Sequence, residues 1–230
     1  MPVTGLALFD LDNTLLDSDG AFMDWAEEAA RKRGLPDGAA RWMCEVAWGL
    51  HGPITDLATA IHDHYGIPVP VEEFKEEMTA GYLSRLACPP DVLNGLDALR
   101  SDGWKVAIVT NGDTERQKAK ITGTGLDAHV DSWVVSEEVG SWKPDPLIFR
   151  TAAERCGVPL TTDTWMVGDS VDHDMAGGIA LGLRTVWIRH GREWTLPDVP
   201  TLMVEHVRDA IAAIRGSDDA SDETADEAVS

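Results

Sequence analysis

Residues 8–16 read LFDLDNTLL, an apolar segment interrupted by two acids that only one leucine separates. Residues 5–9 have the length and apolar character of a buried strand, so Asp10 and Asp12 follow directly at its carboxyl end. Open α/β sheets bind their ligands at that end of the strands. Two carboxylates so close together repel each other unless a cation lies beside them or one of them keeps its proton. The pair therefore indicates a metal-bound nucleophile with a protonated general acid, or simply an acidic turn after a strand.

The composition sets broad limits on the class of protein. The chain has 230 residues, of which 43% are hydrophobic, and a formal net charge of −21. This is enough for one large domain, or a domain with an insertion, around an apolar core. The acidic balance argues against nucleic-acid or membrane partners, because phosphate groups are bound by Lys and Arg. The three widely spaced cysteines are expected to be small buried hydrophobic residues. With neither a membrane span nor a signal-peptide pattern, we expect a cytoplasmic monomer or homodimer.

A helical insert follows the first strand. From about residue 19 to residue 88 the apolar residues recur with helical periodicity, and no segment is convincing as a strand. The expected helices are 21–33, 39–50, 55–65 and 71–86, with Gly- and Pro-containing breaks between them. We therefore assign residues 18–88 to an all-helical inserted domain, and residues 1–17 and 89–215 to the catalytic core. Residues 216–230 are an acidic tail that we expect to be disordered.

Strands and helices alternate after the insert. The strands are expected at 105–110, 130–135, 165–167 and 185–188, and the helices at 92–101, 114–121, 144–156, 174–181 and 203–214. The helix at 114–121 opens with an apparent capping box, Thr114 with Gln117. Strands separated by helices predict a doubly wound parallel α/β sheet with right-handed crossovers.

Polar residues gather where the expected strands end. Thr110 and Asn111 stand between a strand and a helix N-terminus, which is a setting that suits a bound anion. Asp169 and Asp174 follow another strand and should lie at the same edge of the sheet. Lys143 lies between these two segments. Taken alone it would be a surface lysine, since most lysines are exposed. Its occurrence together with the polar segments at Thr110 and Asp169 favours a place in the site.

Four short motifs, taken in order along the chain, resemble those of the haloacid dehalogenase-like hydrolase superfamily. They are DLDNTL from Asp10, TNG from Thr110, KPDP from Lys143 and GDSVDHD from Gly168. The helical insert directly after the first motif resembles the alpha-helical cap of that superfamily's first cap class. The resemblance spans residues 5 to about 190. It implies a Rossmann-like core with strand order 5-4-1-2-3 and a mobile cap over the site.

The resemblance also implies roles for the residues of these motifs. Asp10 would be the nucleophile that attacks phosphorus and becomes an aspartyl phosphate. Asp12 would protonate the leaving alcohol and later deprotonate the attacking water. Thr110 and Lys143 would bind the phosphoryl oxygens, with help from the backbone at Asn111.

A metal site is implied at the same place. The carboxylates of Asp10 and Asp169 and, by family likeness, the backbone carbonyl of Asp12 form an all-oxygen set. Such a set selects Mg²⁺ over zinc. Asp174 would orient a metal-bound water without binding the metal itself.

These observations predict magnesium-dependent hydrolysis of a small phosphorylated metabolite, a phosphomonoester, through an aspartyl-phosphate intermediate. Three alternatives stay open: phosphoglucomutase-like phosphoryl transfer, 2-haloacid dehalogenation, and a non-catalytic binding protein on the same fold. Dehalogenation is disfavoured because dehalogenases lack the acid that corresponds to Asp12. The sequence does not identify the substrate. Candidates for substrate contact, by location in the insert only, are Trp25, Arg41, Trp42, Trp48, His51, Tyr65 and Tyr82, and for the aromatic residues core packing is the favoured interpretation.

Overall fold

The computed structural model describes residues 3–50 and 53–226, with side chains as far as residue 216. The chain divides into two compact units. The core unit contains the residues up to Leu16 and those from Cys88 onward, and the inserted unit is Asp17–Ala87.

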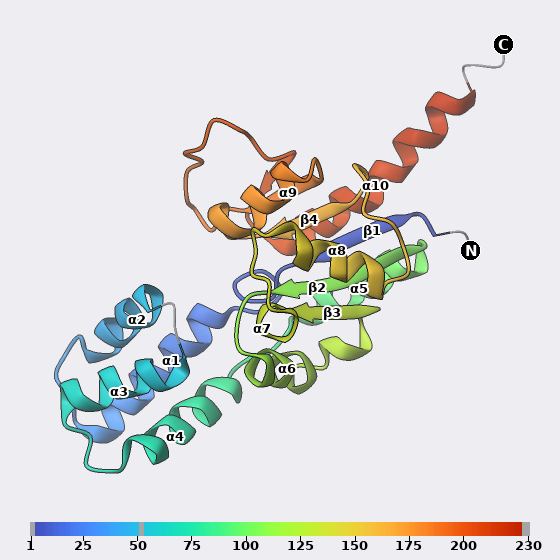
Figure 1. The fold of residues 1–230 in the computed structure, drawn as a ribbon. Helices are drawn as coiled ribbons and strands as arrows, with labels where there is room; N and C mark the ends of the chain where they lie inside the picture. The colour runs from blue at the N-terminus through green and yellow to red at the C-terminus, as the bar shows by residue number, and fades with distance from the viewer. Residues whose placement is uncertain (1–2, 51–52, 227–230) are drawn as a thin grey trace. The chain divides into compact units, whose positions relative to one another are not determined.

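The core unit is built on a six-stranded parallel sheet with the strand order β3-β2-β1-β4-β5-β6 (Figure 1). β1 therefore lies between β2 and β4, with Leu8 opposite Ala107 on one side and Met166 on the other. Strands β1 to β5 have the predicted order 5-4-1-2-3, and β6 extends the sheet beside β5. The predicted α/β fold class is confirmed. The strands are β1 (Gly5–Phe9), β2 (Trp104–Thr110), β3 (Ser132–Val135), β4 (Trp165–Gly168), β5 (Arg184–Ile188) and β6 (Leu202–Val204).

Helices cover both faces of this sheet, as a parallel sheet with apolar residues on both faces requires. Helix α8 packs on one face, in a cluster with alternate residues of the strands that includes Leu8, Val109 and Phe149. The intervening residues point to the opposite face, against which α5 and α10 pack. The helical elements of the core unit are α5 (Pro90–Ser101), α6 (Thr114–Gly123), the 3-10 turn η1 (Leu126–Ala128), α7 (Ser136–Val139), α8 (Pro146–Arg155), the π-helical turn η2 (Val171–Met175), α9 (Ala176–Ala180) and α10 (Val207–Asp226).

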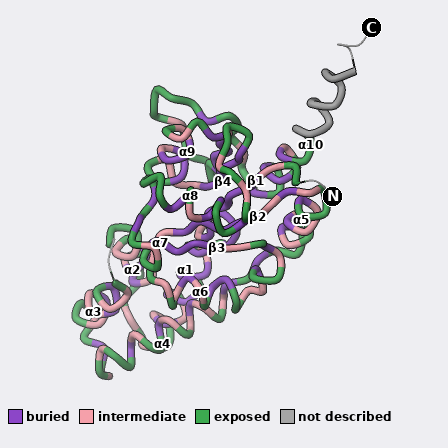
Figure 2. Tube along the Cα trace, turned by 45° about the vertical axis from the view of Figure 1, so that its right-hand side comes forward, coloured by how far each residue is buried: buried purple, intermediate pink, exposed green. Residues whose placement is uncertain are grey.

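The central strands are almost completely withdrawn from solvent. Figure 2 shows β1 and β2 largely buried, while exposed residues lie on the loops and outer helix faces, and every residue of β4 is buried. Polar groups at the ends of such strands are held in place by a rigid framework on either side. All three cysteines are free and buried, as predicted.

The inserted unit is all-helical in its described residues. Its core is aromatic: the rings of Phe22 and Trp25 lie 5.3 Å apart, and Trp25 and Tyr82 are both buried. Phe74 packs at 6.1 Å from Trp25. Core packing, rather than substrate contact, thus explains two of the aromatic candidates. The helices are α1 (Ser18–Arg33), α2 (Ala39–Gly49), α3 (Ile54–Tyr65) and α4 (Val71–Leu83).

Three local predictions differ from the structure. Met203 does not begin a helix but lies in the short edge strand β6, and the closing helix starts at Val207. That helix continues to Asp226, into the segment expected to be disordered, while residues 227–230 lie outside the described part of the chain. The capping box is wrong: the N-cap of α6 is Asp113, whose carboxylate accepts from Arg116 N, and Gln117 instead turns inward.

Candidate active site

Asp10 continues the middle strand of the sheet and is buried beside a lysine. Its backbone N–H donates to Val167 O at 2.9 Å, which extends the pairing of β1 with β4 by one residue. The Nζ of Lys143 lies 2.5 Å from Asp10 Oδ1 and 2.7 Å from Asp174 Oδ1, and donates to Val109 O at 2.8 Å. Lys143 is only 3% exposed, so it is not a surface lysine.

Asn111 fixes the backbone of this lysine. Its Oδ1 accepts from Lys143 N at 2.8 Å, and its Nδ2 donates to Lys143 O at 3.1 Å. Both polar atoms of the amide are thus engaged with one residue. These two bonds tie the end of β2 to the segment that carries Lys143.

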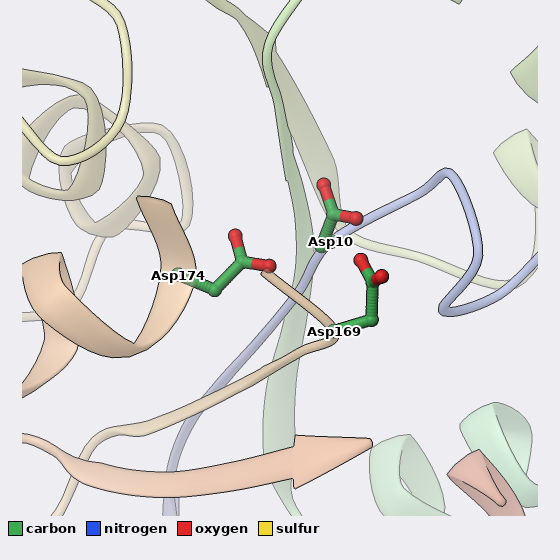
Figure 3. Close-up of side chains that lie close together, drawn as sticks. All are labelled: Asp10, Asp169 and Asp174. Atoms are coloured by element: carbon green, nitrogen blue, oxygen red, sulfur yellow. The ribbon is translucent and has the colours of Figure 1, made fainter. Parts of the chain in front are cut away.

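Three carboxylates face one another at the carboxyl ends of β1 and β4 (Figure 3). Asp10, Asp169 and Asp174 each offer an oxygen, and these atoms lie within 4.8 Å of one another. Asp174 is fully buried on η2, and its Oδ2 accepts from Ser170 N at 3.0 Å. Gly168 permits this approach, because a Cβ there would lie 2.2 Å from Asp174 Oδ2. An all-oxygen cluster of this kind has the chemistry of a site for a hard divalent cation.

Burial dominates the electrostatics of the cluster. It raises the pKa of Asp10 to about 7, against the opposing effect of Lys143, and the negative charge of Asp174 adds to the rise. The pKa of Asp174 is raised for the same reason. Burial alone would lower the pKa of Lys143, but the two carboxylates outweigh it and the pKa is raised. One ammonium thus serves two buried acids, which leaves an excess of negative charge for a metal ion or a proton to neutralise.

Asp169 is the most accessible acid of the cluster. Burial and the charge of Asp10 raise its pKa to about 6. Arg192 opposes this shift from the loop after β5, with its Nη2 donating to Asp169 O at 2.8 Å and to Oδ2 at 3.1 Å. Trp187 Nε1 donates to the same carbonyl at 2.9 Å. These contacts leave the carboxylate of Asp169 directed at the other two acids, as Figure 3 shows.

Asp12 is not among the three clustered carboxylates and has a lysine partner of its own. Lys120 Nζ lies 2.7 and 2.8 Å from the two carboxylate oxygens of Asp12, and Gln117 Nε2 donates to Oδ2 at 2.9 Å. Gln117 also donates to the hydroxyl of Thr110, which is buried at the end of β2. The sequence analysis missed both α6 residues. The available signal was their three-residue spacing, which places them on one face of the helix.

The remaining candidates in the inserted unit have mixed environments. Arg41 is exposed and its Nε lies 2.9 Å from Glu45 on the same helix. Trp42 stacks on His64 with 3.8 Å between ring centroids, and Tyr65 meets both rings edge-on. Trp48 is 51% exposed. His51 lies outside the described residues.

Comparison with known proteins gives the family. The model of the haloacid dehalogenase-like hydrolases matches residues 4–182. The chain belongs to this family. The hydrolase resemblance drawn from the four motifs is thereby confirmed.

Relatives of this hydrolase are named for several activities. Phosphoserine phosphatase of Thermus thermophilus is 33% identical and matches over 90% of this chain and 98% of its own length. Pyrimidine 5'-nucleotidase YjjG of Escherichia coli is 38% identical, but the match covers only 52% of this chain and 53% of that protein. A (S)-2-haloacid dehalogenase of Burkholderia cepacia is also among the relatives.

A solved structure supports the fold assignment of this hydrolase. The crystal structure of a haloacid dehalogenase-family phosphatase from Thermococcus onnurineus is 25% identical, with a TM-score of 0.63. The comparison covers 93% of this chain and 98% of that one. Within the described residues, no helix is both long and apolar enough to cross a membrane.

Proposed function

We propose that this protein hydrolyses a small-molecule phosphomonoester through an aspartyl phosphate on Asp10, with Mg²⁺ as its cofactor. The observation that carries the proposal is that two acids only two residues apart have separate lysine partners, Asp10 with Lys143 and Asp12 with Lys120. The two acids thus have separate surroundings, and we assign nucleophilic attack to Asp10 and proton transfer to Asp12. Two relatives are named as a phosphatase and a nucleotidase, which favours phosphoester hydrolysis.

The residues of the site divide the reaction into two steps. In the first, an Oδ atom of Asp10 attacks phosphorus, and the bond from phosphorus to the leaving oxygen breaks as Asp12 gives that oxygen a proton. In the second, Asp12 takes a proton from water as the water oxygen attacks phosphorus. The bond from phosphorus to Asp10 then breaks and inorganic phosphate is released. Thr110 and Lys143 hold the phosphoryl oxygens, over which the transition state spreads its charge.

Lys143 can hold a phosphoryl oxygen only by giving up a present contact. An ammonium has three donors, and its contacts in the structure are Asp10, Asp174 and Val109 O. Asp10 and Asp169 would hold Mg²⁺ with the backbone carbonyl of Asp12, and Asp174 would orient a water from outside that set. A metal bound there would supply positive charge to Asp10, which would leave the Lys143 ammonium available for the phosphoryl group.

The substrate class is a small phosphorylated metabolite. Three free and buried cysteines suit a reducing compartment, and we place the protein in the cytoplasm.

Phosphoglucomutase-like transfer would use the same residues, and product analysis with hexose phosphates separates it from hydrolysis.

Dehalogenation is the second candidate, because a dehalogenase is among the relatives. Displacing halide from carbon uses a carboxylate nucleophile but requires no acid for the leaving group. Dehalogenation would not use Asp12, which Lys120 and Gln117 hold in place. This arrangement therefore favours phosphoester hydrolysis.

The test is an assay of the purified protein on a panel of phosphomonoesters, with halide release from 2-chloropropionate measured in parallel. We expect release of inorganic phosphate that stops with EDTA and returns with excess Mg²⁺. Halide release without phosphate release would replace the proposal by dehalogenation. Turnover of neither class of substrate would leave a non-catalytic binding protein.

A further inference from the structure

Two polar side chains of helix α6 point into the core unit. Gln117 is 1% exposed and Lys120 is 5% exposed. They are three residues apart and so lie on the same face of the helix. A lysine so deeply buried is rare without a charged partner, and the partner of Lys120 is the carboxylate of Asp12.

The contacts with Asp12 fix both of its oxygens. Lys120 Nζ bridges Oδ1 at 2.7 Å and Oδ2 at 2.8 Å, and Gln117 Nε2 donates to Oδ2 at 2.9 Å. The carboxylate itself is 30% exposed, so solvent reaches it. Charge-assisted hydrogen bonds are the strong ones, and three on one carboxylate restrict its rotation.

Gln117 joins Asp12 to the phosphate-binding hydroxyl. The same Nε2 donates to Thr110 Oγ1 at 2.6 Å, and Asn111 O lies farther away at 3.4 Å. The two N–H groups of the amide thus serve the two nearer acceptors, Asp12 and Thr110. The hydroxyl accepts from the amide, and its own proton has only a long contact, to Asn111 O at 3.5 Å, which it can exchange for a phosphoryl oxygen. Gly112 makes room for this arrangement, because a Cβ there would lie 3.1 Å from Gln117 Cγ and Cδ.

We propose that Gln117 and Lys120 are positioning residues, which hold the Asp12 carboxylate for proton transfer and orient the Thr110 hydroxyl toward phosphate. This inference rests on the proposed phosphatase function and adds two residues to it. Proton transfer requires the acid to lie within hydrogen-bond reach of the leaving oxygen, and a carboxylate free to rotate spends little time there. Neither α6 residue itself forms a bond to phosphorus or transfers the proton; both act through Asp12 or Thr110.

The kinetic test uses variants that keep the shape of the helix. Lys120→Met should lower kcat on an alkyl phosphate such as glycerol phosphate by about 10²-fold, with little change in KM, because positioning and not binding is lost. Lys120→Arg should restore part of the loss. Gln117→Leu should both lower kcat and raise KM, since it also releases Thr110. Lys118→Met removes the same charge from a less buried position of α6 and should behave as the wild type.

The leaving group separates positioning from a general structural defect. With p-nitrophenyl phosphate, Lys120→Met should keep its pre-steady-state burst of p-nitrophenolate, because that leaving group needs little protonation. Its steady-state turnover should still fall, since Asp12 must take a proton from water. Equal losses in the burst, in turnover and on the alkyl ester would overturn the inference, as would a comparable loss in Lys118→Met.

A third measurement does not depend on activity. Lys120→Met should lower Tm because it leaves Asp12 without its main partner, and the double variant with Asp12→Asn should recover part of the loss. Strictly additive losses would overturn the proposed contact. A wild-type protein that turns over no phosphomonoester would refute the proposed function by itself, and the melting experiment would still decide whether α6 holds Asp12.

Discussion

Asp10 and Asp12 stand two residues apart, yet their surroundings assign them different tasks. Asp10→Asn removes the nucleophile, so no phosphoenzyme should form and turnover should fall to background. Asp12→Asn retains the nucleophile but loses an acid–base effect that is typically about 10² to 10⁴ in rate. With p-nitrophenyl phosphate this variant should form the phosphoenzyme and hydrolyse it slowly. Intact-mass spectrometry after rapid quenching should show one added phosphoryl group on Asp10 in Asp12→Asn and none in Asp10→Asn.

Two results would contradict this division of roles. An adduct on a residue other than Asp10 would remove the nucleophile from its assigned place. Equal residual activity in the two variants would mean that the acids act as one unit. Asp172→Asn is the matched control, because this acid belongs to the same motif as Asp169 but is exposed, so its turnover should match the wild type.

Sequence reasoning was effective for residues at strand ends and failed for residues inside a helix. Thr110 ends a strand, and Asp10 and Asp169 directly follow one. The carboxyl ends of parallel strands meet at one edge of the sheet, so these residues could be placed together from the sequence. Lys120 and Gln117 stand in the middle of α6, where a polar residue normally faces solvent. Only the packing of α6 in the core unit turns them toward Asp12. The repulsion between the paired acids was predicted to require a cation or a proton, and the structure shows a lysine ammonium beside each acid.

At the scale of elements, the long periodic segments were predictable and the short ones were not. The four helices of the inserted unit fall within a few residues of their predicted bounds. β6 has three residues and was missed, because so short a strand has no periodicity to read and forms by pairing with β5. The first residue of α6 was predicted correctly, but its cap was misassigned: Asp113, not Thr114, is the N-cap, and Gln117 is engaged elsewhere.

The inserted unit should be separable from the core unit. The core unit closes its own apolar interior with α5, α8 and α10, so replacing residues 19–87 by a short glycine linker should leave it folded. We expect cooperative thermal unfolding and retained turnover of p-nitrophenyl phosphate, with less discrimination among natural phosphomonoesters. Circular dichroism and kcat/KM values over a substrate panel measure both. A deletion variant that cannot fold, or one whose discrimination is unchanged, would show that the insert is a structural element.

At the scale of the whole molecule, the dominant feature is negative charge, and three acidic side chains lie together in the candidate site. The formal net charge is −21, and three carboxylates lie within 4.8 Å of one another with a single lysine between two of them. Burial raises the pKa of Asp10 to about 7 and that of Asp169 to about 6, above the ordinary value of 3.8. The folded metal-free protein therefore binds protons that the unfolded chain has already released at the same pH.

The last prediction concerns how pH and magnesium together set stability. The contribution of these raised pKa values is fully present below about pH 4 and is lost as the pH rises through about 6 to 7. The Tm of the metal-free protein should therefore fall between about pH 5 and pH 8. Mg²⁺ binds the deprotonated acids of the folded state, so it should raise Tm more at pH 8 than at pH 5.

Variants separate this effect from the charge of the molecule as a whole. Asp169→Asn and Asp172→Asn each remove one negative charge, but only Asp169 belongs to the buried cluster. Asp169→Asn should reduce the dependence of Tm on pH, since Asp10 still titrates, and should lose most of the magnesium shift, whereas Asp172→Asn should keep both. Melting curves with EDTA and with excess Mg²⁺ at the two pH values give the answer for each variant. A full magnesium shift in Asp169→Asn would place the metal elsewhere, and a metal-free Tm that rises from pH 5 to pH 8 would contradict the raised pKa values.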